Sequence, residues 1–152
     1  MDKETFALKI LDCEETLYRI SMSMLKNEKD CEDAVQDTIL TAFSKLNTLK
    51  NEQYFKTWLV RILINKCNKQ LHYKKRNMPA TNIEVVNNRE QSTEIKLALE
   101  KLPPKIKIVI VMFYIEDFSI NEIKSVLKIP EGTVKSRLSK GRKLLKLELD
   151  IK

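Results

Sequence analysis

The sequence predicts an all-α protein made of two small helical domains joined by a flexible linker, with a helix-turn-helix in the C-terminal domain. Only two glycines and four prolines interrupt 152 residues, and such sparse breakers favour long helices over many-turned β structure. Apolar residues recur at alternating steps of three and four, which is the spacing of an amphipathic helix. That spacing is lost in the Pro-, Asn-, Thr- and Ser-rich segment 77–93. We therefore expect domains over residues 1–76 and 93–152 and a linker over 77–92.

Two helices are expected at the start of the first domain. The helix over residues 4–26 should contribute an apolar stripe to the core: Phe6, Ile10, Cys13, Leu17, Ile20 and Met24. The second is predicted from Cys31 to Leu46, with Asp30 as its N-cap and with Glu32 and Asp33 in the first turn, where the helix dipole favours acids. Its expected apolar side comprises Ala34, Val35, Thr38, Ile39, Ala42, Phe43 and Leu46.

A third helix is predicted from about Tyr54 to Lys75. Its inward side should contain Phe55, Trp58, Leu59, Ile62, Leu63 and Cys67, and its outer side Lys56, Arg61, Asn65, Lys66 and Lys69. Trp58 is interpreted as a core residue rather than a stacking platform, because it lies on the apolar stripe.

In the second domain, residues 93–102 should form a short helix, and Pro104 suits the first turn of the next one. The run "KIVIVMFYI" has the Ile and Val content of a strand, but its helical flanks favour a buried helix. Ser119 and Glu122 match a capping box that opens a further helix. Pro130 should end that helix, and Thr133 should begin a basic one.

The net charge of +7 is concentrated in two places. Residues 61–78 contain six basic and no acidic residues, and residues 128–152 contain eight basic and three acidic ones. This pattern fits two contact points on one polyanion, and it fits two solvated helix faces equally well.

Residue types needed for catalysis or metal binding are scarce. The three cysteines form no CxxC pair, which fits reduced thiols in a cytosol, and His72 is the single histidine. We therefore predict no catalytic group, no cofactor and no metal site. The apolar run "IVIVMFYI" is too short to span a bilayer, and no signal peptide is visible in "MDKETFALKI", so a cytoplasmic location is expected.

Residues 119–146 have the pattern of a helix-turn-helix. Ile123, Leu127, Ile129, Val134 and Leu138 would lock two short helices together. The second helix would then expose Lys135, Ser136, Ser139, Lys140, Arg142 and Lys143, which can reach phosphates or base edges. Two residues depart from the usual pattern: Lys124 stands where a small residue is common, and Lys128 stands where Gly is common. Amphipathic pairs with basic faces also occur in proteins that never touch DNA.

These segments resemble a known family. "LPPKIKIVIVMFYIEDFSINEIKSVLKIPEGTVKSRLSKGRKLL" is similar to the fourth conserved region of bacterial sigma factors, with "IPEGTVKSRLSKGRK" as its most specific part. "DCEDAVQDTILTAFSKLNTLKNEQYFKTWLVRILINKCNKQL" resembles the second region, through "DAVQDTILTAF" and "FKTWLVRI". Two such regions joined by a short linker are the hallmark of the extracytoplasmic-function (ECF) group of the sigma-70 family.

The resemblance implies three contact surfaces. The basic helix would read the promoter −35 element in the major groove through the six side chains given above. The −10 element would meet Leu49, Lys50, Asn51, Arg61, Asn65, Lys66 and Lys69. Core RNA polymerase would be bound, through a coiled coil of its largest subunit, by Asp33, Gln36, Asp37, Leu40 and Phe43. The polymerase flap would be a further contact.

The resemblance thus implies a transcription initiation factor without an active site of its own. It also implies control by an anti-sigma factor, and a membrane-anchored one would hold the chain at the inner face of the membrane. The alternative is a stand-alone helix-turn-helix regulator that binds an operator without polymerase. A nucleic-acid enzyme would need a nucleophile or a metal cluster, and the sequence suggests neither.

Overall fold

The computed structural model describes residues 1–77 and 94–149, and the described residues contain helices and no strand. Contacts within the chain divide it into two compact units, Met1–Glu84 and Val85–Lys152. The all-α prediction is confirmed. Most of the predicted linker, 77–92, lies outside the described residues. No described helix combines the length and apolar character needed to cross a bilayer.

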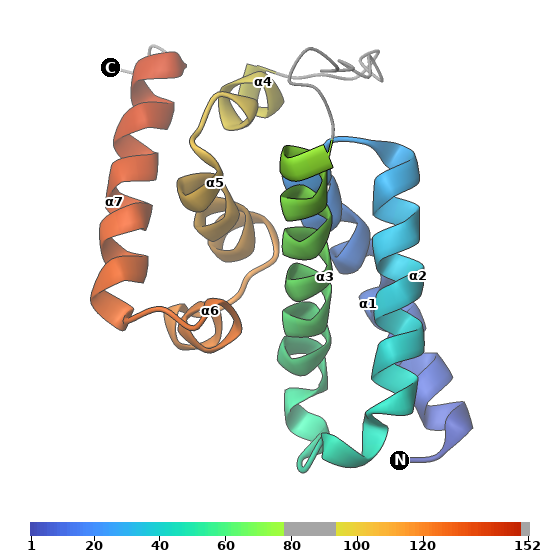
Figure 1. Ribbon diagram of the computed structural model, residues 1–152. Coiled ribbons are helices and arrows are strands. Elements are labelled where there is room, and N and C mark those ends of the chain that lie inside the picture. Colours follow the sequence, from blue (N-terminus) through green and yellow to red (C-terminus); the bar gives the residue numbers. More distant parts are fainter. Residues whose placement is uncertain (78–93, 150–152) are drawn as a thin grey trace. The chain divides into compact units, whose positions relative to one another are not determined.

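The first unit is built on three helices that pack side by side (Figure 1): α1 (Lys3–Leu25), α2 (Glu28–Ser44) and α3 (Phe55–Asn77). Two short 3₁₀ turns, η1 (Leu46–Thr48) and η2 (Glu52–Tyr54), join α2 to α3. The predicted stripe of α1 is buried from Phe6 to Ile20, but Leu25 rather than Met24 is its last buried residue. The ring of Phe6 packs 5.4 Å from Phe43 and 5.9 Å from Phe55, measured between centroids.

The predicted N-cap of α2 is wrong. The helix begins at Glu28, and the side chain of Asn27 accepts a hydrogen bond from the backbone N–H of Asp30 at 3.0 Å. Asn and Asp are about equally good N-caps, so local sequence could not choose between them. Asp30 instead pairs with Lys74 near the end of α3, which ties the two helices together. Because the helix begins at Glu28, Asp33 lies beyond the first turn.

The second unit contains α4 (Glu94–Glu100), α5 (Pro104–Ile110), a π-helical turn η3 (Val111–Ile115), α6 (Ile120–Leu127) and α7 (Glu131–Glu148). The apolar run is helical, as predicted, and Val109, Ile110 and Met112 are buried. A helix that is apolar on every side must be surrounded by protein, and here α7 packs against α5.

The helix starts of α6 and α7 were both predicted from local capping rules, and only the start of α7 differs from the prediction. The Ser119 capping box is confirmed, with hydrogen bonds of 2.9 and 3.0 Å to Glu122. The last helix starts at Glu131 rather than Thr133. The cause is Pro130, which is the N-cap and whose carbonyl accepts the N–H groups of Thr133 and Val134 at 3.0 and 3.2 Å.

Candidate promoter and polymerase interfaces

Helix α7 presents a basic face to solvent. Val134 and Leu138 are buried on its inner side. Of the six predicted −35 contacts, Ser139 is half-buried and the others are exposed: Lys135, Ser136, Lys140, Arg142 and Lys143. The Lys135 ammonium lies 3.2 Å from the Glu131 carboxylate, and Arg142 donates a hydrogen bond of 3.1 Å to the hydroxyl of Tyr114. The face can therefore offer cationic donors to phosphates and base edges.

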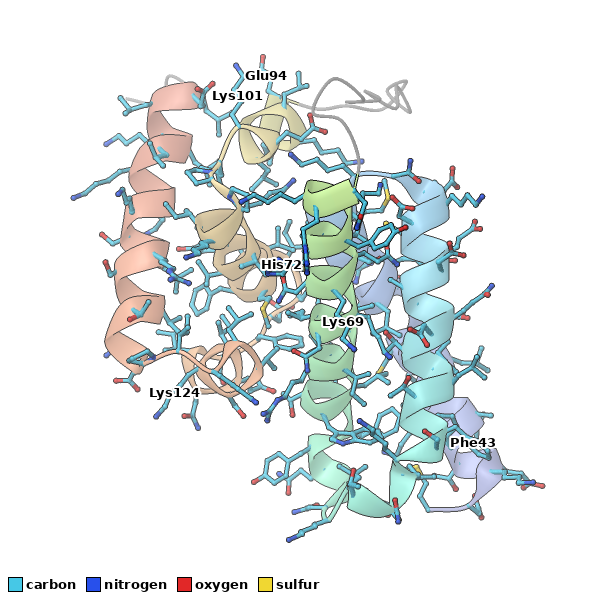
Figure 2. All side chains as sticks on the ribbon, in the orientation of Figure 1. Phe43, Lys69, His72, Glu94, Lys101 and Lys124 are labelled. Carbon is cyan, nitrogen blue, oxygen red and sulfur yellow. The ribbon has the colours of Figure 1, made fainter. Side chains whose placement is uncertain are left out.

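Helix α6 holds α7 in place through an apolar lock. Ile123 and Val134 are fully buried, and Leu127 and Ile129 are half-buried. Val126, which the sequence analysis missed, is 4% exposed and completes the lock. Its position three residues after Ile123 places it on the same apolar face of the helix, and this spacing could have predicted its burial. Figure 2 shows Lys124 on the outer side of α6, and this side chain is exposed.

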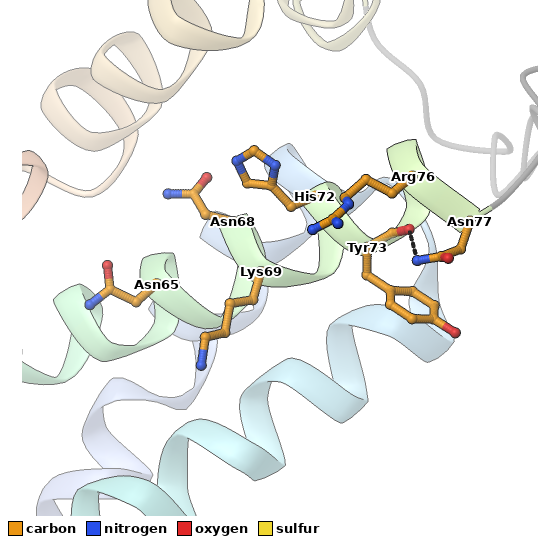
Figure 3. A pocket seen from close by; sticks show the side chains of 7 residues that line it. All are labelled: Asn65, Asn68, Lys69, His72, Tyr73, Arg76 and Asn77. Carbon is orange, nitrogen blue, oxygen red and sulfur yellow. Dashed lines mark hydrogen bonds between the residues drawn. The ribbon is translucent and has the colours of Figure 1, made fainter.

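The outer face of α3 carries a polar hollow of about 310 Å³ (Figure 3). Two predicted −10 contacts, Asn65 and Lys69, line it and are exposed. Its remaining lining residues are Asn68, His72, Tyr73, Arg76 and Asn77. Sequence reasoning missed these five residues, although steps of three and four from Asn65 reach Asn68, Lys69, His72 and Arg76. The hollow combines amide groups, rings and cations, which are the groups that hold unstacked bases and phosphates.

The other two predicted −10 contacts on α3 are less accessible than expected. Arg61 is half-buried. The Lys66 side chain is 23% exposed, and its ammonium lies 3.2 Å from the carboxylate of Asp37 on α2. The expectation that Lys66 projects freely from the outer side is therefore corrected, because the neighbouring helix supplies a counter-ion. The prediction that Trp58 is core is only partly correct, since this residue is half-buried and packs 5.8 Å from Phe55.

The connection between α2 and α3 carries the last three predicted −10 contacts. Lys50 and Asn51 are exposed, and Leu49 is half-buried. The side chain of Asn51 accepts a 3.0 Å hydrogen bond from the N–H of Gln53, so it caps η2. Tyr54 at the end of the same connection is 58% exposed and was not predicted as a site residue.

The exposed face of α2 combines acids with apolar groups. The predicted polymerase contacts Asp33, Gln36, Asp37, Leu40 and Phe43 are all exposed. Leu40 is 70% exposed and Phe43 is 45% exposed, and Figure 2 shows Phe43 towards the end of α2. The sequence analysis also placed Phe43 on the buried side, and the structure explains both placements: one part of the ring packs on Phe6 and the rest faces solvent.

The thiols of the first unit are buried. Burial raises the pKa of Cys67 to about 12, and the nearby Cys31 adds to the shift. Burial also raises the pKa of Cys13 and of Cys31. All three are therefore neutral at pH 7. Among the described residues, no group of three or more His, Cys, Asp or Glu side chains could hold a metal ion.

Two family models match this chain. Sigma-70 region 2 matches residues 10–77, and sigma-70 region 4 matches residues 92–145. These segments contain α2 and α3 in the first unit, and α6 and most of α7 in the second.

Relatives and solved structures agree with the family models. The chain is 31% identical to the RNA polymerase sigma factor SigV of Bacillus subtilis, over 92% of this chain and 88% of the relative. It is 29% identical to the ECF sigma factor SigW of the same species, over 97% and 90%. The structure of CnrH in complex with the cytosolic domain of CnrY has a TM-score of 0.76 at 26% identity, over 98% and 90%. The sigma factor RpoE, crystallised with NepR from Bartonella quintana, shares the fold with a TM-score of 0.83 at 23% identity, over 97% and 98%. The chain therefore belongs to the sigma-70 family of RNA polymerase sigma factors, in its extracytoplasmic-function group.

Proposed function

We propose that this chain binds core RNA polymerase through α2 and directs it to promoters that α7 reads at the −35 element and α3 helps to melt at the −10 element. The observation that carries this assignment is the occurrence of two basic faces and one acidic, apolar face on three separate helices of one sigma factor. As an initiation factor it has no active site of its own, and polymerase performs the chemistry. A stand-alone operator-binding regulator is not favoured, because the relatives that match nearly the full length are sigma factors.

At the −35 element, α7 would lie in the major groove. Lys135, Ser136 and Ser139 occupy its first turns, which are the part of a recognition helix that contacts base edges. Lys140, Arg142 and Lys143 follow and would contact phosphates. The buried Val134 and Leu138 keep this face turned outwards by packing against α6 and the rest of the second unit.

At the −10 element, the hollow on α3 would hold the separated strand. Asn65 can bond a base edge, and Lys69 can contact a phosphate. The connection with Leu49, Lys50 and Asn51 would receive a base taken out of the stack, and Arg61 and Lys66 would support the phosphates from beside the hollow. Lys66 can do so only after it exchanges Asp37 for a phosphate.

On α2, the exposed Leu40 and Phe43 would be the apolar centre of a polymerase contact, with Asp33, Gln36 and Asp37 around it. Apolar side chains surrounded by polar ones are typical of protein interfaces, and the acids would complement a basic partner. This division assigns polymerase and −10 binding to residues 1–76 and −35 binding to residues 93–152.

We further propose that an anti-sigma factor controls the chain. RpoE was crystallised with the anti-sigma factor NepR, and the structure of CnrH is that of a complex with the cytosolic domain of CnrY. An anti-sigma factor that covers the α2 face would block polymerase, and a membrane-anchored one would hold the chain at the inner face of the membrane. Affinity purification from unstressed cells should recover such a partner. Recovery of the chain with polymerase alone would contradict this part of the proposal.

Run-off transcription tests the main proposal. Purified chain added to core polymerase should give promoter-specific transcripts, and the chain alone should bind the same promoter duplex weakly. Tight, sequence-specific binding of the free chain, without any transcript in the presence of core polymerase, would instead support an operator-binding regulator.

A further inference from the structure

Helix α6 carries a polar stripe to which the proposed function gives no role. Asn121, Lys124, Ser125 and Lys128 are spaced as i, i+3, i+4 and i+7, so they share one side of the helix, and all four are exposed. Together with Ile129 and Pro130 they line a hollow of about 620 Å³. The hollow therefore runs along α6 to the residue that immediately precedes α7.

The two lysines of the stripe have no counter-ion within the described part of the chain. Lys135 and Lys101, by contrast, each lie 3.2 Å from a carboxylate, those of Glu131 and Glu148. The acid on α6, Glu122, is engaged in the capping box with Ser119. The stripe thus presents two uncompensated positive charges beside an amide and a hydroxyl, and both of these polar groups can donate hydrogen bonds to an anion.

The backbone at Lys128 adds an independent observation. Its φ of 56° and ψ of 48° lie in the left-handed region, and its N–H and that of Ile129 both donate to the carbonyl of Lys124. Gly takes this conformation without the steric penalty that a side chain brings. The side chain of this left-handed residue is exposed and lines the hollow, so a cation stands at the C-terminal end of the stripe.

We propose that this stripe is a second phosphate-binding site, which contacts the DNA backbone next to the −35 element. When a recognition helix lies in the major groove, the helix before it crosses the backbone. The hollow ends at Pro130, directly before α7, so the stripe and the start of α7 would meet adjacent parts of one duplex. Lysine is suited to this contact because its ammonium group binds phosphate as a point charge. The inference rests on the proposed function of α7.

The test compares holoenzymes on duplex promoter DNA at a temperature too low for melting. Lys124→Gln/Lys128→Gln should reduce the logarithmic salt slope by about 1.8, at about 0.9 per lost phosphate contact. The ratio of the variant's Kd to the wild-type Kd should then fall roughly 12-fold as salt rises from about 50 to about 200 mM. The loss should be equal for preferred and altered −35 sequences, because phosphates carry no sequence information. Lys105→Gln, which removes one exposed charge on α5, is the control for the single variants Lys124→Gln and Lys128→Gln and should keep the wild-type slope.

A second variant separates binding from folding. Lys128→Gly should raise the melting temperature of the second unit by roughly 4–8 °C, because it relieves the left-handed residue, and should still weaken DNA binding. A double variant with an unchanged salt slope would overturn the inference, even if it bound an acidic protein partner less tightly. If the wild-type chain gives no promoter-specific transcript with core polymerase, the proposed function fails, and the α6 inference that rests on it fails too. If wild type transcribes and the salt slope of the double variant is unchanged, only the α6 site fails.

Discussion

Gly141 shows what one residue contributes to the framework that displays the basic face. A Cβ added at this position would lie 2.6 Å from Cδ1 and Cγ1 of Ile110 and 3.0 Å from Cγ2 of Ile106. We expect Gly141→Ala to destabilise the second unit by about 1–3 kcal/mol, the usual cost of overpacking a tight core. Gly132→Ala is the matched control, since nothing lies within 4 Å of its added Cβ, and it should stabilise α7 by about 0.5–1 kcal/mol. Thermal unfolding of both variants measures the contrast, and equal shifts would contradict the close packing of α5 and α7.

A single buried thiol should make stability depend on alkaline pH. The pKa of Cys67 is about 12 in the folded chain against an ordinary value of 9.0, so the unfolded chain releases this proton first. Its contribution is complete below pH 9 and is lost as pH rises from 9 towards 12, at about 1.4 kcal/mol per pH unit. Urea unfolding at successive pH values should show a shallower alkaline decline for Cys67→Ala than for wild type. Parallel curves would mean that the thiol is not shielded from solvent.

Leu40 and Leu11 form a matched pair for the polymerase contact. Both are exposed leucines of the first unit, at 70% and 61%, but only Leu40 lies on the acidic face of α2. We expect Leu40→Ala to weaken binding to core polymerase by about 1–2 kcal/mol, a change of roughly five- to thirtyfold, because apolar groups at the centre of an interface dominate its energy. Leu11→Ala should bind like wild type. A binding titration with purified core polymerase tests this, and equal losses from both variants would remove α2 as the specific contact.

At the scale of elements, the Asp37–Lys66 pair joins the proposed polymerase face of α2 to the proposed DNA face of α3. The pair is partly exposed, so Asp37→Asn should change the free energy of unfolding by only about 0–1 kcal/mol. The same change should weaken polymerase binding, because it removes an exposed acid from the α2 face. Lys66→Gln should leave polymerase binding unchanged and reduce promoter opening. Binding titrations and strand-opening assays on the two variants separate these effects, and identical defects in both would contradict the division between α2 and α3.

The elements were predictable wherever a short stretch of sequence decided them. The stripe of α1 from Phe6 to Ile20, Pro104 at the start of α5 and the Ser119 capping box depend on residues within one or two turns, and each is confirmed. The starts of α2 and α7 were misplaced by three and two residues, because Asn27 rather than Asp30 caps α2 and Pro130 is the N-cap of α7. A helix end depends on small free-energy differences between alternative capping residues, whereas a repeated apolar stripe adds many consistent contributions.

At the scale of the whole molecule, each unit has a core of its own. Phe6, Leu17 and Leu63 are buried in the first unit, and Val109, Ile123 and Leu138 in the second. We therefore expect residues 1–77 and 94–152, expressed separately, each to unfold in a cooperative transition. The second fragment should be the less stable, because a domain of about 60 residues buries a smaller fraction of its surface. Calorimetry of the fragments tests this expectation, and a fragment that remained unfolded would show that its core needs the other unit.

By itself, the sequence determined the helical class, the family and the approximate faces of α2, α3 and α7, because periodicity and motif spacing are properties of contiguous residues. Only the tertiary structure decided which side chains of those faces are exposed and which pair with a neighbouring helix. It placed Asp37 against Lys66, exposed part of the Phe43 ring while the rest packs on Phe6, and gathered five further residues beside the predicted Asn65 and Lys69 around the α3 hollow. These features depend on the rotation of each helix against its neighbours. Side chains far apart in the chain set that rotation together, so no local pattern records it.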